Sequence, residues 1–209
     1  MNKYITEFIG TFFLVMVVGL AGLMPAGMAP VAIGSALMVM IYAGGHISGA
    51  HYNPAVTLAV LIRGRIDAMG AVIYVICQLI GAAAGALVAV KIFGAGGDGH
   101  SAIADGNTMR GLTAEILGTF ALAYVILNVA TAKKNSGNSH YGLAIGFTVL
   151  AMAYALGGFS GGAFNPAVAI GQCIGGHMAW ADIWVYLVGC LGGGILAGIV
   201  FKISNADDK

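Results

Sequence analysis

The tripeptide Asn-Pro-Ala occurs twice in this chain of 209 residues, at positions 53–55 and again at positions 165–167. Each copy lies in a longer segment that matches the other, 45–56 against 157–168, at a constant offset of 112 residues. Matches at the same offset extend to Tyr74 and Tyr186, far from the motifs. Such an internal repeat indicates that the two halves of the chain form related structures.

The composition indicates a membrane protein. Only 8% of the residues are charged and 59% are apolar, whereas a soluble domain has about a quarter of its residues charged. The three cysteines are odd in number and lie in apolar segments, which is typical of buried thiols rather than of a disulfide or metal site. No basic run suggests a nucleic-acid partner, so the expected surroundings are a lipid bilayer.

Six apolar segments are candidates for membrane-spanning helices, since about 20 apolar residues cross a bilayer. The second and fifth are short and are expected to extend into their loops. Three spans per half give the halves opposite orientations, an inverted repeat within one membrane domain over 1–209, with repeat one at about 1–93 and repeat two at about 110–204. The six segments are 4–23, 30–45, 68–93, 111–132, 141–157 and 182–203.

Two further apolar segments, 54–62 and 166–174, are too short to span. Nine residues of helix reach only about 14 Å, roughly half of a membrane. Each begins with the Pro of an Asn-Pro-Ala motif, and Pro suits the first helical turn while Asn is a favoured N-cap. Each motif therefore predicts the start of a half-spanning helix entered from a Gly-rich loop.

The paired motifs, their Ser-Gly-x-x-x-Asn-Pro-Ala context and the Glu-x-x-Gly-Thr-Phe opening of each half resemble the aquaporin or major intrinsic protein family over essentially the whole chain. The resemblance implies an all-α membrane protein, with six transmembrane and two half-spanning helices in a right-handed bundle. It also implies a homotetramer with one pore per subunit and no cofactor or metal. The pore motifs would be Asn53, Pro54, Ala55, Asn165, Pro166 and Ala167.

In this family the half-helices meet at mid-membrane, where two positive helix ends oppose the passage of cations and protons. Loop carbonyls before each motif would accept hydrogen bonds from solutes in single file. Glu7 and Glu115 would brace these loops, a proton relay being the alternative. The expected pore carbonyls are those of Gly49, Ala50, His51, Gly161, Gly162 and Ala163.

The chain departs from the family pattern at the outer constriction. Val168 stands where family members usually carry Arg, and Ala169 replaces the Asp that marks glycerol channels. The result would be a wide, apolar ring without a fixed charge. Alternatively, Arg110, Lys91 or His100 folds in as a substitute for the missing Arg. The ring positions are Ile33, Ala153, Gly162 and Val168.

The predicted function is a passive channel for water and small uncharged solutes such as polyols, urea, ammonia, hydrogen peroxide or metalloid hydroxides. A coupled secondary transporter and a membrane adhesion or scaffold protein are the alternatives. The residue pattern shows no catalytic arrangement, so no enzyme is expected.

His46 and His51, in the loop before the first motif, suggest either loop packing or a pH gate. His100, His140 and His177 are expected to be solvated.

Basic residues predict the orientation, and small residues predict the packing. The positive-inside rule places both termini in the cytoplasm, with the protein in the plasma membrane. Small residues in the third span of each half are expected to let helices approach closely. The basic residues on one side are Lys3, Arg63, Arg65, Lys133, Lys134, Lys202 and Lys209. The glycines are Gly81, Gly85, Gly189, Gly192, Gly193 and Gly194.

Overall fold

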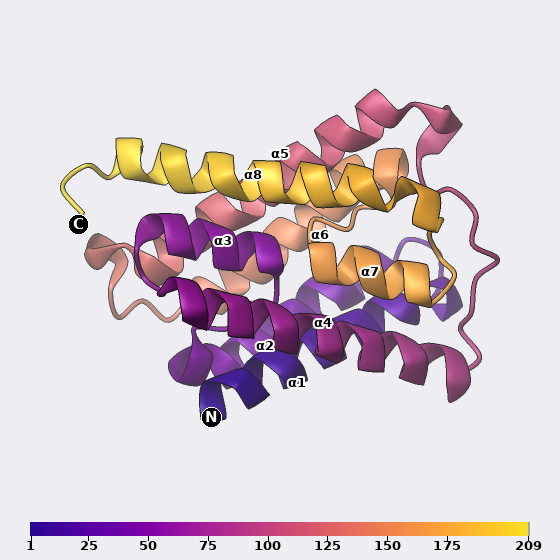
Figure 1. The fold of residues 1–209 in the computed structure, drawn as a ribbon, viewed down its shortest axis with the longest axis horizontal. Coiled ribbons are helices and arrows are strands. Elements are labelled where there is room, and N and C mark those ends of the chain that lie inside the picture. The colour runs from indigo at the N-terminus through magenta and orange to yellow at the C-terminus, as the bar shows by residue number, and fades with distance from the viewer. Residues whose placement is uncertain (209) are drawn as a thin grey trace.

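The computed structural model describes residues 1–208, and within this range it is entirely helical (Figure 1). A π-helical turn, Leu127–Thr131, continues the fifth helix, and short 3₁₀ turns lie in several connections. The helices are α1 (Asn2–Gly19), α2 (Ala29–Ser48), α3 (Pro54–Arg63), α4 (Ala68–Lys91), α5 (Thr108–Ile126), α6 (Tyr141–Ser160), α7 (Pro166–Ile174) and α8 (Ile183–Ser204).

Six of these helices are long, and α3 and α7 are the two short ones predicted from the motifs. Five long helices are both long and apolar enough to cross a membrane: α2, α4, α5 with its π turn, α6, and α8 with the preceding turn. The sixth long helix, α1, has 18 residues and carries Lys3 and Glu7. Helices α2 and α6 extend to Ser48 and Ser160, so His46 lies inside a helix and not in a loop as expected.

The two repeats interlock through their short helices. Helix α1 packs against α4, α5 packs against α8 in the same way, and α2 packs against α6 across the repeats. Helix α3 of the first repeat packs mainly against α8 of the second, and α7 packs mainly against α4 of the first. In Figure 1 the two short helices lie almost end to end in the middle of the bundle. The fold therefore brings both Asn-Pro-Ala motifs to its centre.

Close helix packing depends on glycine at several crossings. Gly34 and Gly146, 112 residues apart, face each other where α2 meets α6, and a Cβ on Gly34 would lie 2.7 Å from the Gly146 oxygen. A Cβ on Gly193 would lie 2.5 Å from the Ile116 oxygen of α5. Small residues thus permit contact between helix backbones, as expected in lipid. The expectation is wrong for Gly192, whose Cβ would have no neighbour within 4 Å in the part of the chain that the structure describes.

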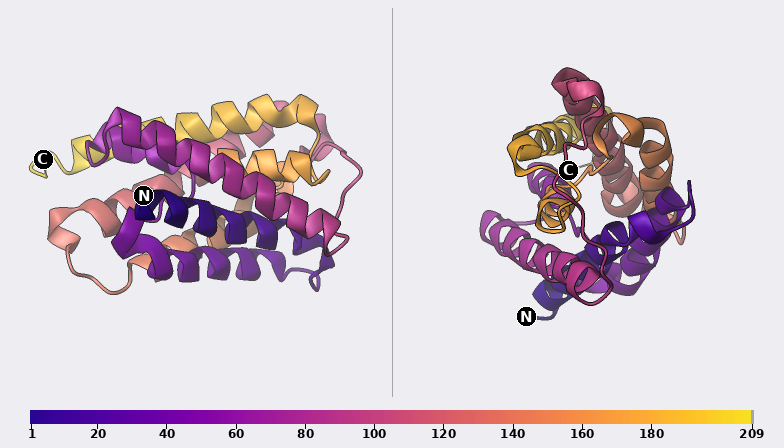
Figure 2. Two further views of the ribbon diagram at one scale, coloured as in Figure 1. Left: turned by 60° about the horizontal axis from the view of Figure 1, so that its bottom comes forward. Right: turned by 90° about the vertical axis from the view of Figure 1, so that its right-hand side faces the viewer.

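The outside of the bundle is apolar, and its two ends differ. Along α4, large apolar side chains at Val72, Ile76, Ile80 and Leu87 are exposed on one side of the helix, which suits contact with lipid rather than water. Both termini lie towards the same end of the bundle (Figures 1 and 2), and the long connection between α4 and α5 lies at the opposite end. We call these the terminal end and the outer end.

Candidate functional site

The asparagine of each motif caps the short helix that follows it. Asn53 Oδ1 accepts hydrogen bonds from the backbone N–H of Ala55 at 2.8 Å and of Val56 at 3.4 Å. Asn165 Oδ1 accepts one from Ala167 at 2.9 Å. These bonds satisfy N–H groups that have no partner within the helix. The cap orients each asparagine so that its amide nitrogen points away from its own helix.

Each amide nitrogen donates to the loop of the other repeat. Asn53 Nδ2 lies 3.0 Å from the Phe164 oxygen, and Asn165 Nδ2 lies 2.9 Å from the Tyr52 oxygen. The pair of bonds fastens the two helix N-termini together across the centre of the bundle. Because a side-chain amide carries two hydrogens, one N–H of each asparagine remains for a molecule in the adjoining cavity.

Glu7 holds the loop before the first motif. Its Oε1 accepts from Ser48 Oγ at 2.6 Å and from the His51 N–H at 3.0 Å. Its Oε2 accepts from the Tyr52 N–H and from Gln78 Nε2, both at 2.8 Å. With four donors aimed at it, this buried carboxyl acts only as an acceptor.

Glu115 holds the second loop through equivalent positions. It accepts from Ser160 Oγ at 2.7 Å, from the Ala163 N–H at 3.0 Å and from the Phe164 N–H at 2.7 Å. Cys190 Sγ, which corresponds to Gln78 at the offset of 112, is the fourth donor at 3.3 Å. Both carboxyls are committed to loop geometry, and neither lies among the residues that line the cavities described below.

The loops adopt a backbone that requires such support. Ala50, Tyr52 and Phe164 have positive φ angles of 52°, 51° and 49°, a conformation that costs non-glycine residues roughly 1–2 kcal/mol. Within the described residues, no hydrogen bond ends on the carbonyl oxygens of segments 49–51 and 161–163. Unpaired carbonyls need water or solute partners, and all six residues line one of two cavities.

The outer cavity has a volume of about 300 Å³ and is lined in part by the four predicted ring residues. Both motif asparagines also line it, so the ring and the helix N-termini face one space. Among the described residues, its lining includes no Asp, Glu, Lys or Arg. The ring residues that share it are Ile33, Ala153, Gly162 and Val168.

None of the three proposed substitutes for the missing Arg lines this cavity in the described structure. Lys91 is exposed at the end of α4, and His100 is exposed and pairs with Asp98. Arg110 lies in the first turn of α5 and borders a surface groove with Met109. The alternative of a folded-in cation has no support in this arrangement.

The inner cavity, of about 860 Å³, opens towards the terminal end. It shares Ile41, Ala50, His51 and Ile126 with the outer cavity, so the two meet beside the first motif. His51 is buried there, with Nδ1 3.1 Å from Thr57 Oγ1 and its ring edge-on to Tyr74. Its side chain packs within the loop, the first of the two alternatives suggested by the sequence.

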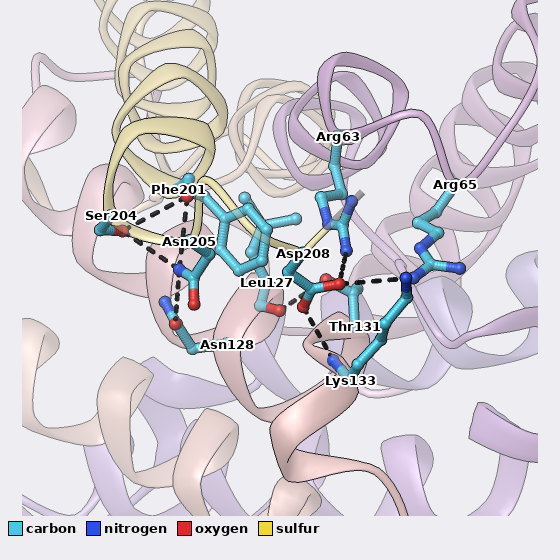
Figure 3. Close-up of polar contacts among 10 residues, drawn as sticks. All are labelled: Arg63, Arg65, Leu127, Asn128, Thr131, Lys133, Phe201, Ser204, Asn205 and Asp208. Atoms are coloured by element: carbon cyan, nitrogen blue, oxygen red, sulfur yellow. Dashed lines mark hydrogen bonds and ion pairs between the residues drawn. The ribbon is translucent and has the colours of Figure 1, made fainter.

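The C-terminal segment contacts the end of α3 and the turn that follows α5 through Asp208 (Figure 3). Asp208 accepts from Arg63 Nη2 and from the Lys133 N–H, both at 2.8 Å, and lies 3.9 Å from Arg65. The hydrogen bond from Lys133, together with the nearby Arg63 guanidinium, holds the pKa of Asp208 below its usual value. Arg65 and Lys133 line the inner cavity.

Two polar residues of the outer cavity were missed by sequence reasoning. Gln172 and His177 both line it, although His177 was expected to be solvated. The helical spacing of Asn165, Val168 and Gln172 could have identified Gln172, because these three positions share one helix face. No sequence signal predicts that His177 lines the cavity, because its ring is held by the carbonyl of Ala95, which lies 82 residues earlier in the chain.

Two inverted repeats whose half-helices meet between an inner and an outer cavity define a membrane channel. The model of the family described as "Major intrinsic protein" matches residues 1–201. The chain belongs to the major intrinsic protein family.

Relatives of known name agree with this assignment. The chain is 39% identical to "Glycerol uptake facilitator protein-like 6" of Lactiplantibacillus plantarum, with both chains covered completely. It is 37% identical to "Probable aquaporin TIP2-2" of Oryza sativa subsp. japonica, over 97% of this chain and 86% of the relative. The fold is similar to that of the aquaglyceroporin from Plasmodium falciparum, with a TM-score of 0.83, 21% identity and coverage of 98% and 97%.

Family membership decides between the functional alternatives. The protein is a passive channel for water and small solutes, and not an enzyme. A coupled transporter and an adhesion protein are therefore set aside.

Proposed function

We propose that this channel conducts small uncharged solutes larger than water, in addition to water. The observation that carries the proposal is the shared outer cavity of the four ring residues, whose lining among the described residues has no Asp, Glu, Lys or Arg. An arginine at the position of Val168 would occupy part of this space and would supply fixed donors. Val168 leaves the space open and apolar, which favours the carbon surface of a polyol.

Exclusion of ions in this proposal depends on the centre of the pore. Both half-helices direct their N-termini there, each equivalent to roughly half a positive charge. The asparagine amides and the unpaired loop carbonyls provide hydrogen bonds for a neutral solute, while the two positive helix ends oppose a cation. The name of the bacterial relative, a glycerol uptake facilitator, supports a polyol among the conducted solutes.

Stopped-flow light scattering of proteoliposomes under water, glycerol and urea gradients tests the proposal. We expect Val168→Arg to lower the ratio of glycerol to water permeability by roughly tenfold, equivalent to about 1.4 kcal/mol of added barrier. Val168→Met is the matched control, since it has similar length without charge or donors. A wild-type channel without glycerol or urea flux, or an unchanged ratio in Val168→Arg, would refute the proposal.

We further propose that the terminal end faces the cytoplasm of a plasma membrane. Arg63, Arg65 and Lys133 gather there around Asp208, in agreement with the positive-inside rule. A C-terminal tag should be cleaved by added protease in inside-out vesicles and protected in right-side-out ones. Cleavage of the tag in right-side-out vesicles only would show that the terminal end faces the outside, against this proposal.

The assembly proposed from the family resemblance is a homotetramer with one pore in each subunit. The exposed apolar faces of the long helices, such as that of α4, would supply the contacts between subunits and with lipid. Light scattering of the detergent-solubilised protein, corrected for bound detergent, should give four times the mass of the 21.1 kDa chain. A monomer mass would refute this assembly.

A further inference from the structure

One face of α7 lines the outer cavity from the centre of the bundle outward. Asn165, Val168 and Gln172 all contribute to the lining, as their spacing of three and four residues requires. At 1.5 Å per residue, Gln172 lies about 6 Å farther out than Val168. Its side-chain amide makes no hydrogen bond to any described residue, so its donors and acceptor are available to a molecule in the cavity.

His177 is held beside Gln172 by contacts at both ends. Its backbone N–H donates to the Gln172 oxygen at 2.9 Å, and its Nε2 lies 2.8 Å from the Ala95 oxygen. A carbonyl can only accept, so Nε2 carries the hydrogen and Nδ1 remains as the second polar atom of the ring. The ring lies over Gly175, where a Cβ would come within 2.9 Å of Cδ2.

The outer connection is tied to the same place. The N–H of Gly97 donates to the Gly175 oxygen at 2.9 Å, and that of Gly99 donates to the Gly176 oxygen at 2.6 Å. Together with the contact between His177 and Ala95, three hydrogen bonds fix this connection on the C-terminal end of α7. The positions of Gln172 and His177 are therefore set by the fold and not by a free loop.

We propose that Gln172 and His177 form the polar part of the selectivity site, about one helical turn outside the apolar ring. The proposal rests on the proposed conduction of uncharged solutes. A polyol or urea molecule that enters an apolar ring must give up water, which is costly unless other groups replace those hydrogen bonds. Gln172 can both donate to and accept from a hydroxyl or amide group, while the carbon surface of the solute faces the ring.

Water needs less of this help because its small size lets it keep hydrogen bonds to neighbouring waters in the file. The residues at this site should therefore control the permeability of hydroxyl- and amide-bearing solutes more than that of water. This assigns to Gln172 and His177 the hydrogen bonds to the solute that the side chain of Val168 cannot form.

The test measures glycerol, urea and water permeability of proteoliposomes that contain wild type, Gln172→Met, Gln172→Glu or His177→Phe. We expect Gln172→Met, which keeps the side-chain length but removes the hydrogen bonds, to lower glycerol and urea permeability by roughly tenfold, with water permeability within about twofold of wild type. His177→Phe should act in the same direction, and Gln172→Glu, which keeps acceptors, should retain more glycerol flux than Gln172→Met.

The water permeability of the same vesicles shows that each variant is folded and inserted. Solute-to-water ratios at the wild-type value in both Gln172→Met and His177→Phe would overturn this inference while leaving the proposed function intact. Absence of glycerol and urea flux in wild type would remove the proposed function and this inference together.

Discussion

Glu7 and Glu115 show how single residues make the pore possible. The loops before each motif must leave the helical path and expose carbonyls to the cavities, which places Tyr52 and Phe164 in the left-handed region. The N–H of Tyr52 donates to Glu7 at 2.8 Å, and the N–H of Phe164 donates to Glu115 at 2.7 Å. The carboxyls thus offset the strain of a backbone that hydrogen bonds of regular helix cannot stabilise.

Glu115→Gln should destabilise the protein. Each oxygen of Glu115 accepts a backbone N–H, one from Ala163 and one from Phe164, so the amide nitrogen of glutamine would face a donor in either orientation. A buried unsatisfied donor costs about 1–3 kcal/mol. Thermal unfolding in detergent should show a lower Tm and the proteoliposomes a lower water permeability. The exposed Asp105→Asn serves as the control, and a wild-type Tm in Glu115→Gln would contradict the prediction.

At the scale of elements, the bundle is held by pairs of helices whose backbones touch at glycine. Gly81 brings α4 against α1, and Gly193 brings α8 against α5, with the offset of 112 residues between them. Gly194 lies against the backbone of α3 at Ala55. The third helix of each repeat thus positions a half-helix as well as its neighbouring span. The sequence predicted helix contacts for these glycines as a group. It could not distinguish Gly192, at which a Cβ would point into open space.

Gly193→Ala and Gly192→Ala form a matched pair in adjacent positions of α8. A methyl group on Gly193 would meet the Ile116 oxygen at 2.5 Å and the Phe120 nitrogen at 2.9 Å, so the helices must separate. We expect this overpacking to cost about 1–3 kcal/mol. Gly192→Ala has no clash and gains helix propensity of up to roughly 1 kcal/mol. Equal Tm values for the two variants would show that the crossing tolerates a side chain.

Across the whole molecule, the C-terminal segment joins parts that are distant in the sequence. Asp208 connects the end of α8 to Arg63 at the end of α3 and to Lys133 after α5. Arg63 is also 4.8 Å from the centre of the Phe201 ring, beneath the same segment (Figure 3). The terminal end of the bundle is therefore held together next to Arg65 and Lys133, which line the inner cavity.

Asp208→Asn should loosen this end in a pH-dependent way. The pKa of Asp208 is lowered in the folded protein from 3.8, so its contact stabilises the fold above that pH and is lost as the pH falls through the lower folded value. Limited proteolysis near the C-terminus should therefore be faster for Asp208→Asn than for wild type at neutral pH. The difference should shrink below about pH 4. The neighbouring exposed Asp207→Asn should behave as wild type, and equal cleavage at neutral pH would argue against the contact.

The sequence by itself determined the helices, the inverted repeat and the family, because these depend on local signals and on their repetition along the chain. Apolar length predicts a span, and Asn-Pro predicts a helix start to the residue at both motifs. Only the tertiary structure decided which groups meet. The crossed asparagine bonds join residues 111 and 113 positions apart, and the bond between His177 and Ala95 spans 82 positions. Such contacts depend on how packed helices place their loops, which no local pattern encodes.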